Sequence, residues 1–323
     1  MKDYSARIHR IELPVPFPIK TTNVYLVDED PMTLIDSGTK TEISFVALKD
    51  SLQTLGYQID DIKRILITHG HVDHYGQARG IASQSGAEIY IHKRDYERIQ
   101  AMEQFRGNLV SVLKQNGTPT GLIEGTLDYM KSVIGSLAEP LGEVSHINDG
   151  DEIHFQEMVF RSIHCPGHSP GLMCFYLEEG SILISGDHLL NEISPNPVID
   201  LSRTGPGPQS TSLQDYLASV RKVEGLTVSL VLPGHGEPIQ DFRGTLNKIL
   251  LHHERRLSTV LSILSSRGKT AYEISQALFP NANTSEVFLG MSEVLGHLRI
   301  LLDDGKIRFK SRRGIDYYSM KRA

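Results

Sequence analysis

Residues 68–74 read THGHVDH and follow the apolar stretch RILI at 64–67. This stretch holds three histidines and one aspartate at the end of an expected strand. Neutral imidazole nitrogens and carboxylate oxygens bind divalent metal ions, and a strand-end loop can direct several side chains to one point. His69 and His71 can therefore share one ion, while Asp73 and His74 fall on the opposite side of the loop, placed for a second. The alternative is a polar surface loop with incidental histidines.

Three further loops repeat the same design, in which an apolar strand or a tight turn delivers a metal-type ligand. CPGHSPG at 165–171 holds His168 between two Pro-Gly turns, SILISGDHL at 181–189 delivers Asp187, and LVLPGHG at 230–236 delivers His235. Glycine and proline fix such turns. Loops at strand ends commonly carry function, so we expect all these side chains at one rim of a sheet assembly.

Together with LIDSG at 34–38, these stretches resemble the ordered motifs of the metallo-β-lactamase superfamily, over roughly residues 7–240. The resemblance implies an α+β fold, an αββα sandwich with metals at the edge of two packed sheets. It implies a two-ion site whose first ion is held by His69, His71 and His168 and whose second is held by Asp73, His74 and His235. Asp187 would bridge the two ions, and Asp36 would support the ligands through hydrogen bonds.

The expected cofactors are two divalent metal ions, with zinc first and iron or manganese as alternatives that the same ligands suit. Two such ions lie roughly 3.5 to 4 Å apart and can lower the pKa of bound water to about 7. A metal-bridged hydroxide then becomes the nucleophile of a binuclear metallohydrolase, with Asp73 and Asp187 as its catalytic carboxylates. We expect a small ester, thioester or lactone as substrate. The alternatives are an endoribonuclease and an iron-dependent oxidoreductase on the same scaffold.

The remaining sequence predicts one catalytic domain, 1–240, with a helical insertion at about 93–140, and a helical C-terminal domain, 241–323. Apolar and β-branched runs before residue 93 and after residue 151 predict the strands. Three stretches within residues 245–305 have helical patterns, and KIRFKSRRGIDYYSM at 306–320 predicts a hairpin with a basic turn. This tail resembles the small winged-helix domain of one superfamily branch, the lactamase-beta-like hydrolases and endoribonucleases.

Charge is distributed unevenly along the 323 residues, whose net charge is −6. Residues 251–323 carry 12 Lys and Arg against 7 Asp and Glu, an excess of +5, whereas the residues before them carry −11. Nucleic acid binding by the tail is therefore an alternative, with Lys306, Arg308, Lys310, Arg312 and Arg313 as its basic residues. We favour a packing role, in pocket closure or in a homodimer, because the excess is modest.

Several weaker predictions concern surroundings and location. His188, Tyr75 and Asn191 lie next to ligand motifs and are candidates for the substrate pocket. The apolar content of 39% includes no run long enough to span a membrane, and MKDYSARIHR lacks the apolar core of a signal peptide. Two cysteines are too few for a disulfide framework. We therefore expect a cytoplasmic enzyme that acts on a small molecule and has no membrane partner.

Overall fold

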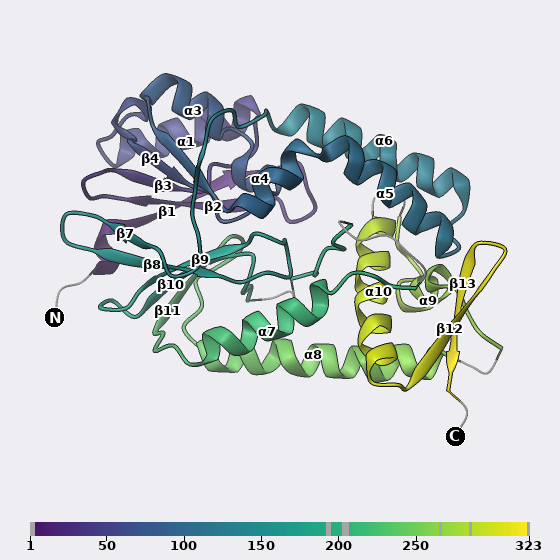
Figure 1. Ribbon diagram of the computed structural model, residues 1–323. Coiled ribbons are helices and arrows are strands. Elements are labelled where there is room, and N and C mark those ends of the chain that lie inside the picture. The colour runs from purple at the N-terminus through teal and green to yellow at the C-terminus, as the bar shows by residue number, and fades with distance from the viewer. Residues whose placement is uncertain (1–3, 192–194, 202–206, 265–266, 284–285, 322–323) are drawn as a thin grey trace.

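The computed structural model describes residues 4–191, 195–201, 207–264, 267–283 and 286–321. Two β-sheets face each other, and helices cover the outer face of each sheet (Figure 1). This arrangement is the αββα sandwich that the sequence predicts. Each sheet buries one face against its partner sheet and the other against helices, so that the apolar strands are covered on both sides.

The first sheet is built mainly from the N-terminal part of the chain. Its strands are adjacent in chain order, β1 (Ile8–Pro14), β2 (Thr21–Val27), β3 (Thr33–Ile35), β4 (Arg64–Leu66), β5 (Glu88–Ile91) and β6 (Ser145–His146). The first three strands pair antiparallel, and those from β3 to β6 pair parallel. The parallel strands β3 and β4 therefore end at the same edge, where the motif loops begin.

The second sheet follows in the chain and has the order β11-β10-β9-β8-β7. Its strands are β7 (Glu152–His154), β8 (Val159–His164), β9 (Met173–Leu177), β10 (Ile182–Gly186) and β11 (Leu230–Pro233). Only the β10–β11 pair is parallel, so that the loops after these two strands leave the sheet at one edge. These loops carry Asp187 and His235.

Alternating side chains of the strands enter different cores. Tyr25 and Ile35 point between the sheets, whereas their neighbours Leu26 and Leu34 point toward the outer helices, and all four are almost completely buried. Successive side chains of a strand point to opposite faces, so a strand covered on both sides is apolar throughout. The continuous apolar runs of the sequence follow from this double burial.

Helices α1 (Glu42–Thr54) and α3 (Ala78–Ser85) lie over the first sheet, and α7 (Ser212–Glu224) lies over the second (Figure 1). Helix α1 begins where the Thr41 side chain accepts a hydrogen bond from the Ser44 amide, an N-cap. Leu48 and Leu52, four residues apart on one face, are fully buried in the core beneath this helix. The short 3-10 helices η1 (Tyr4–Arg7) and η2 (Ile59–Asp61) complete this part.

The predicted helical insertion at about 93–140 is confirmed. It consists of α4 (Lys93–Gln100), α5 (Met102–Gln115) and α6 (Thr120–Leu137), between β5 and β6. Leu109 and Leu113 of α5 are fully buried, yet their apolar partners do not lie in the sandwich. They belong to a core that the insertion shares with the C-terminal residues.

The C-terminal residues form α8 (Phe242–Ile263), α9 (Ala271–Leu278), α10 (Val287–Asp303) and the hairpin β12 (Ile307–Arg312) and β13 (Ile315–Met320). The predicted helices and hairpin are thus present, while the winged-helix classification and the domain boundary at residue 240 stay predictions. Val294 and Leu298 of α10 contribute to the core shared with α5 and α6. None of the described helices is long and apolar enough to cross a membrane.

Candidate metal centre

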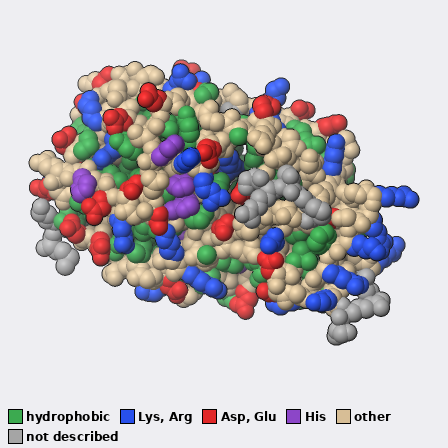
Figure 2. Space-filling model, in the orientation of Figure 1, with side chains coloured by type: hydrophobic (Ala, Val, Ile, Leu, Met, Phe, Trp, Pro, Cys, Tyr) green, Lys and Arg blue, Asp and Glu red, His purple; other side chains and the backbone are tan. Residues whose placement is uncertain are grey.

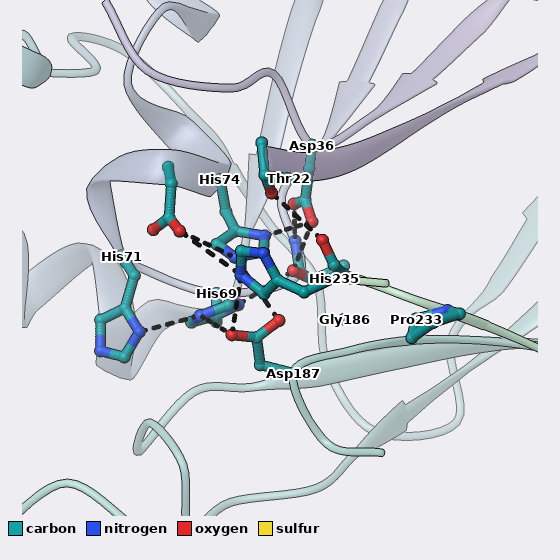
Figure 3. Close-up of polar contacts among 12 residues, drawn as sticks. Thr22, Asp36, His69, His71, His74, Gly186, Asp187, Pro233 and His235 are labelled. Atoms are coloured by element: carbon teal, nitrogen blue, oxygen red, sulfur yellow. Dashed lines mark hydrogen bonds and ion pairs between the residues drawn. The ribbon is translucent and has the colours of Figure 1, made fainter. Parts of the chain in front are cut away.

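All seven predicted ligands come together at one rim of the sandwich, from four segments that are far apart in sequence. Figure 3 shows five of them close together, namely His69, His71, His74, Asp187 and His235. His69 follows β4, His168 lies between β8 and β9, Asp187 follows β10, and His235 follows β11. The sequence prediction placed Asp73 and His74 in a loop, whereas both belong to a short helix, α2 (Val72–Tyr75). Four residues are too few to display helical periodicity, which explains this error.

Three histidines form the first group. Nε2 of His69 and Nε2 of His168 each lie 3.0 Å from Nδ1 of His71. Two nitrogens that bind one tetrahedral zinc at ~2.0–2.1 Å lie roughly 3.3 Å apart, so these contacts are close to the spacing of ligands on one ion. His71 presents Nδ1, whereas the other two present Nε2.

Asp73, His74 and His235 form the second group. The Asp73 Oδ2 atom lies 3.4 Å from Nε2 of His235 and 3.8 Å from Nε2 of His74. All three side chains are buried. In this group, as in the first, one candidate ligand atom of each residue lies within 4.8 Å of those of the other two.

Asp187 lies between the two groups. Its Oδ2 atom is 3.5 Å from Nε2 of His168 and 4.0 Å from Nε2 of His69 on one side, and 3.3 Å from Nε2 of His235 on the other. Its Oδ1 atom is 3.6 Å from Nε2 of His74. One carboxylate therefore faces ligand nitrogens of both groups, which is the position that a bridging ligand requires.

Asp36 supports the site through three hydrogen bonds. It accepts from the Thr68 amide and hydroxyl, both at 2.7 Å, and lies 2.8 Å from Nδ1 of His74 (Figure 3). Because the Thr68 hydroxyl donates to Asp36, its oxygen can accept a hydrogen bond from Nδ1 of His69 at 3.0 Å. A ring that donates through Nδ1 presents an unprotonated Nε2 to the centre.

Backbone carbonyls orient the other two rings in the same way. The Asn196 carbonyl lies 3.0 Å from Nδ1 of His168, and the Thr21 carbonyl lies 2.7 Å from Nδ1 of His235. Thus four of the five site histidines have an oxygen acceptor at Nδ1. Their Nε2 atoms are the ones that converge.

Strand β2 holds the His235 loop against the first sheet. Asn23 donates to the carbonyls of Pro233 and Gly236, and the Tyr25 hydroxyl donates to the Pro233 carbonyl at 2.6 Å. Gly234 allows a close approach, because a Cβ atom there would lie 2.3 Å from Oδ1 of Asp187. These contacts join the two sheets at the rim where the candidate ligands meet.

The electrostatics of the site keep its carboxylates ionised. Burial opposes ionisation of Asp73, but the adjacent His74 and His235 outweigh burial and lower the pKa of Asp73 to about 2. Burial also opposes ionisation of Asp187, and the same two histidines hold its pKa well below the ordinary value. Burial lowers the pKa values of His69 and His71, which keeps both rings neutral. Against the effect of burial, the nearby carboxylates raise the pKa of His74 well above its ordinary value and that of His235 to about 10. Because neutral imidazoles and ionised carboxylates are the forms that bind metal ions, these two rings release a proton when an ion binds.

Two buried atoms in the centre fit the surroundings that a cation would provide. Nε2 of His74 and Oδ1 of Asp187 are buried and have no hydrogen-bond partner among the described residues. Buried polar atoms are nearly always paired with protein atoms, water or an ion, because an unpaired one costs about 1–3 kcal/mol. The donor set of imidazoles and carboxylates fits divalent ions such as zinc, iron and manganese.

A cavity of about 340 Å³ opens beside the centre. The insertion lines it through α4 and α5, residues 199–201 form another part of the wall, and Pro170, two residues after His168, also belongs to the lining. The three predicted pocket residues do not line this cavity. His188 and Tyr75 are buried, with His188 packed edge-on against the Tyr216 ring, and Asn191 is exposed at the surface.

Several residues around the centre have no motif in the sequence. Asp95 of α4 accepts hydrogen bonds from the Gly70 amide, the Ser169 hydroxyl and the Gly171 amide, so it joins two ligand loops. Arg98 lines the cavity on the same helix. The helical periodicity of α4 predicts a helix but gives no sign that its polar face contacts the ligand loops.

A second group of metal-type side chains, His252, His253 and Glu293, lies between α8 and α10. Nε of Arg256 lies 3.3 Å from Oε1 of Glu293, so the carboxylate already has a cationic partner. His253 instead packs in the interior, 5.4 Å between ring centroids from His297 and 5.7 Å from Tyr216. We interpret this group as part of the contact between helices.

Comparisons with known proteins agree with this geometry. Residues 19–235 match the metallo-beta-lactamase superfamily. A Bacillus subtilis (strain 168) protein named probable metallo-hydrolase YqjP is 30% identical over 299 residues, which cover 90% of this chain and 91% of that protein. A beta-lactamase-like protein 2 homolog of Caenorhabditis elegans is 22% identical over 299 residues, 91% of this chain and 83% of its own length.

Solved structures extend the similarity to the insertion and the C-terminal helices. A metallo-beta-lactamase family protein from Thermus thermophilus superposes with a TM-score of 0.85 at 28% identity, covering 98% of this chain and 99% of that one. A beta-lactamase domain protein from Burkholderia ambifaria shares the fold, with a TM-score of 0.84 at 22% identity and coverage of 98% and 92%. Because the family match covers more than half of the sequence and the metal-type side chains converge where the fold requires, the chain belongs to the metallo-beta-lactamase superfamily and to its metallo-hydrolases.

Proposed function

We propose that the rim of the sandwich holds two divalent metal ions, with zinc as the expected metal. His69, His71 and His168 would hold one ion, and Asp73, His74 and His235 would hold the other. Asp187 would contribute to both, because it faces nitrogens of both groups at 3.3 to 4.0 Å. The unpaired atoms of His74 and Asp187 support this assignment, since a cation at the centre would satisfy both.

The protein's own groups would position the reactants. The ions, when bound, activate water as a nucleophile and polarise a carbonyl oxygen. Asp73, ionised at neutral pH because its pKa is about 2, can accept a hydrogen bond from the attacking water and orient it. The hydrogen bonds from Asp36 and Thr68 fix the ligand rings, so that the site requires little rearrangement during the reaction.

We further propose that the reaction is hydrolysis of a small ester, thioester or lactone. The observation that carries this proposal is the cavity of about 340 Å³ whose lining includes Pro170, two residues after His168, because its size is near the lower limit of small-molecule sites. Water would add to the acyl carbon, the bond to oxygen or sulfur would break, and the leaving alcohol or thiol would take a proton. The helical insertion would supply one wall of the substrate site.

A metal assay combined with a substrate panel tests the proposal. The purified protein would be assayed for zinc, iron and manganese and then offered thioesters, esters, lactones and single-stranded RNA. We expect two metal equivalents per chain and turnover of the acyl compounds that a chelator removes and zinc restores. Metal-dependent RNA cleavage without acyl hydrolysis, or a single iron with oxygen consumption, would contradict it.

The bridging assignment predicts that Asp187→Ala loses most activity, by at least about 100-fold, and binds fewer metal ions. Asp128→Ala, on the exposed surface of α6, is the matched control and should keep both properties. Metal content and turnover would be measured on the same preparations. Full activity in Asp187→Ala would refute the bridge.

Phosphodiester cleavage in RNA is the second candidate. Its support is the hairpin β12–β13, where the Lys and Arg side chains of β12 are exposed. Lys and Arg side chains gather at the end of the molecule that holds the C-terminus (Figure 2). A nucleic acid partner would contact this hairpin through phosphates, and its affinity would fall steeply with salt. The acidic charge of the remaining chain disfavours this candidate.

A further inference from the structure

The cavity beside the metal centre has an uneven distribution of charge. Four of its lining residues are charged, Arg94, Glu97, Arg98 and Asp200. Nη2 of Arg94 lies 3.5 Å from Oδ2 of Asp200, and Nζ of Lys93 lies 3.6 Å from Oε1 of Glu97. Both acidic groups therefore have a cationic partner. Arg98 is the remaining cation.

Arg98 has no hydrogen bond or ion pair with the described part of the chain. Its guanidinium group instead lies over the Phe105 ring, 5.1 Å from the ring centroid, and the side chain is only partly exposed. A guanidinium group has five N–H donors, and leaving them unpaired in a partly buried site is costly. An anion in the cavity would satisfy these donors.

The helix that carries Arg98 is fixed to the ligand loops. Asp95, one turn earlier in α4, accepts hydrogen bonds from the Gly70 amide at 2.7 Å and the Gly171 amide at 2.8 Å. A Cβ atom on Gly70 would lie 3.3 Å from the side chain of Ile99, the neighbour of Arg98. The cation is thus held at a defined place relative to the loops of His69, His71 and His168. Figure 2 shows histidine side chains beside Lys or Arg side chains on this face.

We infer that the cavity binds a carboxylate group of the substrate through Arg98, so that the enzyme acts on acyl compounds whose acyl chain ends in a carboxylate. This inference rests on the proposed acyl hydrolysis. The scissile carbonyl would lie at the metal centre and the acyl chain along Phe105 and Ile199, apolar lining residues. The far carboxylate would form paired hydrogen bonds with Arg98, a geometry that guanidinium and carboxylate share.

The charge balance of the lining favours a carboxylate over a phosphate monoester. Arg98 is the lining cation without an ion pair, although the carboxylates of Asp95 and Asp200 act on its charge from a distance. Its one positive charge matches one negative charge of a ligand. A phosphate monoester carries about two negative charges at neutral pH, and Glu97 and Asp200 would repel the second. The other polar side chains of the lining, Asn108 and Gln104, are neutral and add no charge to this balance.

Matched thioesters of N-acetylcysteamine would test this inference with the metal-loaded full chain. Each pair differs by a carboxylate in place of the terminal methyl group: succinyl and butanoyl, adipoyl and hexanoyl, suberoyl and octanoyl. We expect a higher kcat/KM for the carboxylate member in at least one pair. In Arg98→Met the ratio of the two kcat/KM values should fall by about 10- to 100-fold, the effect of losing a charged hydrogen-bonded partner.

Four further variants separate the effect of charge from effects on the structure. Arg98→Lys should keep part of the preference, because it keeps the charge without the paired donors. Ala101→Glu, on an exposed lining position, should lower the preference by adding an opposing charge, whereas Ala101→Gln should not. Arg221→Met removes an exposed arginine of α7 and should leave the ratio at its original value. An equal ratio in Arg98→Met and the parent protein would overturn the inference.

Direct binding keeps the inference distinct from the proposed function. Calorimetry with adipate on the metal-loaded protein should give an affinity that falls by about 10- to 100-fold in Arg98→Met. If no acyl compound is hydrolysed while this difference persists, the proposed function fails and the carboxylate site stands. Equal adipate affinity in both proteins rejects the site. Inorganic phosphate that binds more tightly than adipate, and only with Arg98 present, would reject the carboxylate assignment.

Discussion

At the residue scale, the convergence of the candidate ligands could be predicted because each of their segments directly follows a strand or a turn that the sequence itself indicates, although Asp73 and His74 lie in the short helix α2 rather than in a loop. His69 and His71 follow the apolar strand β4 directly, and Asp187 follows β10. The choice of ring nitrogen was not predictable, because it depends on hydrogen bonds to residues far away in sequence, such as Thr21 for His235. Arg98 was missed because its helix belongs to the insertion and has no recognisable motif.

Gly234 illustrates a residue whose role only the structure reveals. A Cβ atom at this position would lie 2.3 Å from Oδ1 of Asp187 and 2.8 Å from Cε1 of His74, so Gly234→Ala should displace both side chains. We expect metal affinity to fall by about 10- to 100-fold, as for other disturbed ligand supports. Competition with a chromogenic chelator measures this affinity. Gly107→Ala in α5, where nothing lies near the added methyl group, is the control, and equal affinities in the two variants would contradict the prediction.

At the scale of elements, continuous apolar runs predicted the main strands, and the change to helical patterns predicted the insertion. The insertion was expected at about 93–140, and its helices run from Lys93 to Leu137. Strand β6 was not predicted, because it has only two residues and both are exposed, so no alternation or apolar run marks it. Backbone pairing with β5 alone defines this strand.

Helix α10 connects the C-terminal core to the cavity. The Ser292 hydroxyl accepts a hydrogen bond from the Ile199 amide, which holds the wall formed by residues 199–201. Leu298 is fully buried in the shared core, whereas Leu289 on the same helix is 43% exposed. Leu298→Ala should therefore lower the free energy of unfolding by about 2–5 kcal/mol. Leu289→Ala should change it by less than about 1 kcal/mol, and chemical denaturation would measure both. Similar losses in the two variants would argue against this packing.

At the scale of the whole molecule, no pattern in the sequence indicates that the insertion and the C-terminal helices share a core. Leu113 in α5 and Leu298 in α10 belong to one cluster, although 185 positions separate them. Each helix shows its apolar face, but sequence periodicity does not say which two faces meet. The tail packs against the insertion through this core. Its predicted role in pocket closure or in a homodimer and the alternative of nucleic acid binding by the hairpin stay predictions.

His253 lies where three helices of the molecule meet, since its ring contacts Tyr216 of α7 and His297 of α10. Burial lowers its pKa to about 3, the neighbouring side chains of His297, His252 and Arg256 act in the same direction, and Glu293 opposes them. The ordinary pKa is about 6.5, so the unfolded chain binds this proton more readily. Stability is therefore present above pH ~6.5 and is lost as pH falls toward about 3.

Between pH 7 and pH 5 this single group should remove about 2 kcal/mol of unfolding free energy. A glutamine side chain is not protonated in this range. The change in unfolding free energy between pH 7 and pH 5 should therefore be smaller in His253→Gln by that amount. This difference holds even if the substitution lowers stability at every pH. The matched control is His252→Gln, because the side chain of His252 is 39% exposed. Denaturation of the three proteins at both pH values gives the comparison. An identical pH dependence in His253→Gln and the parent protein would show that the junction of α7, α8 and α10 does not keep this ring neutral.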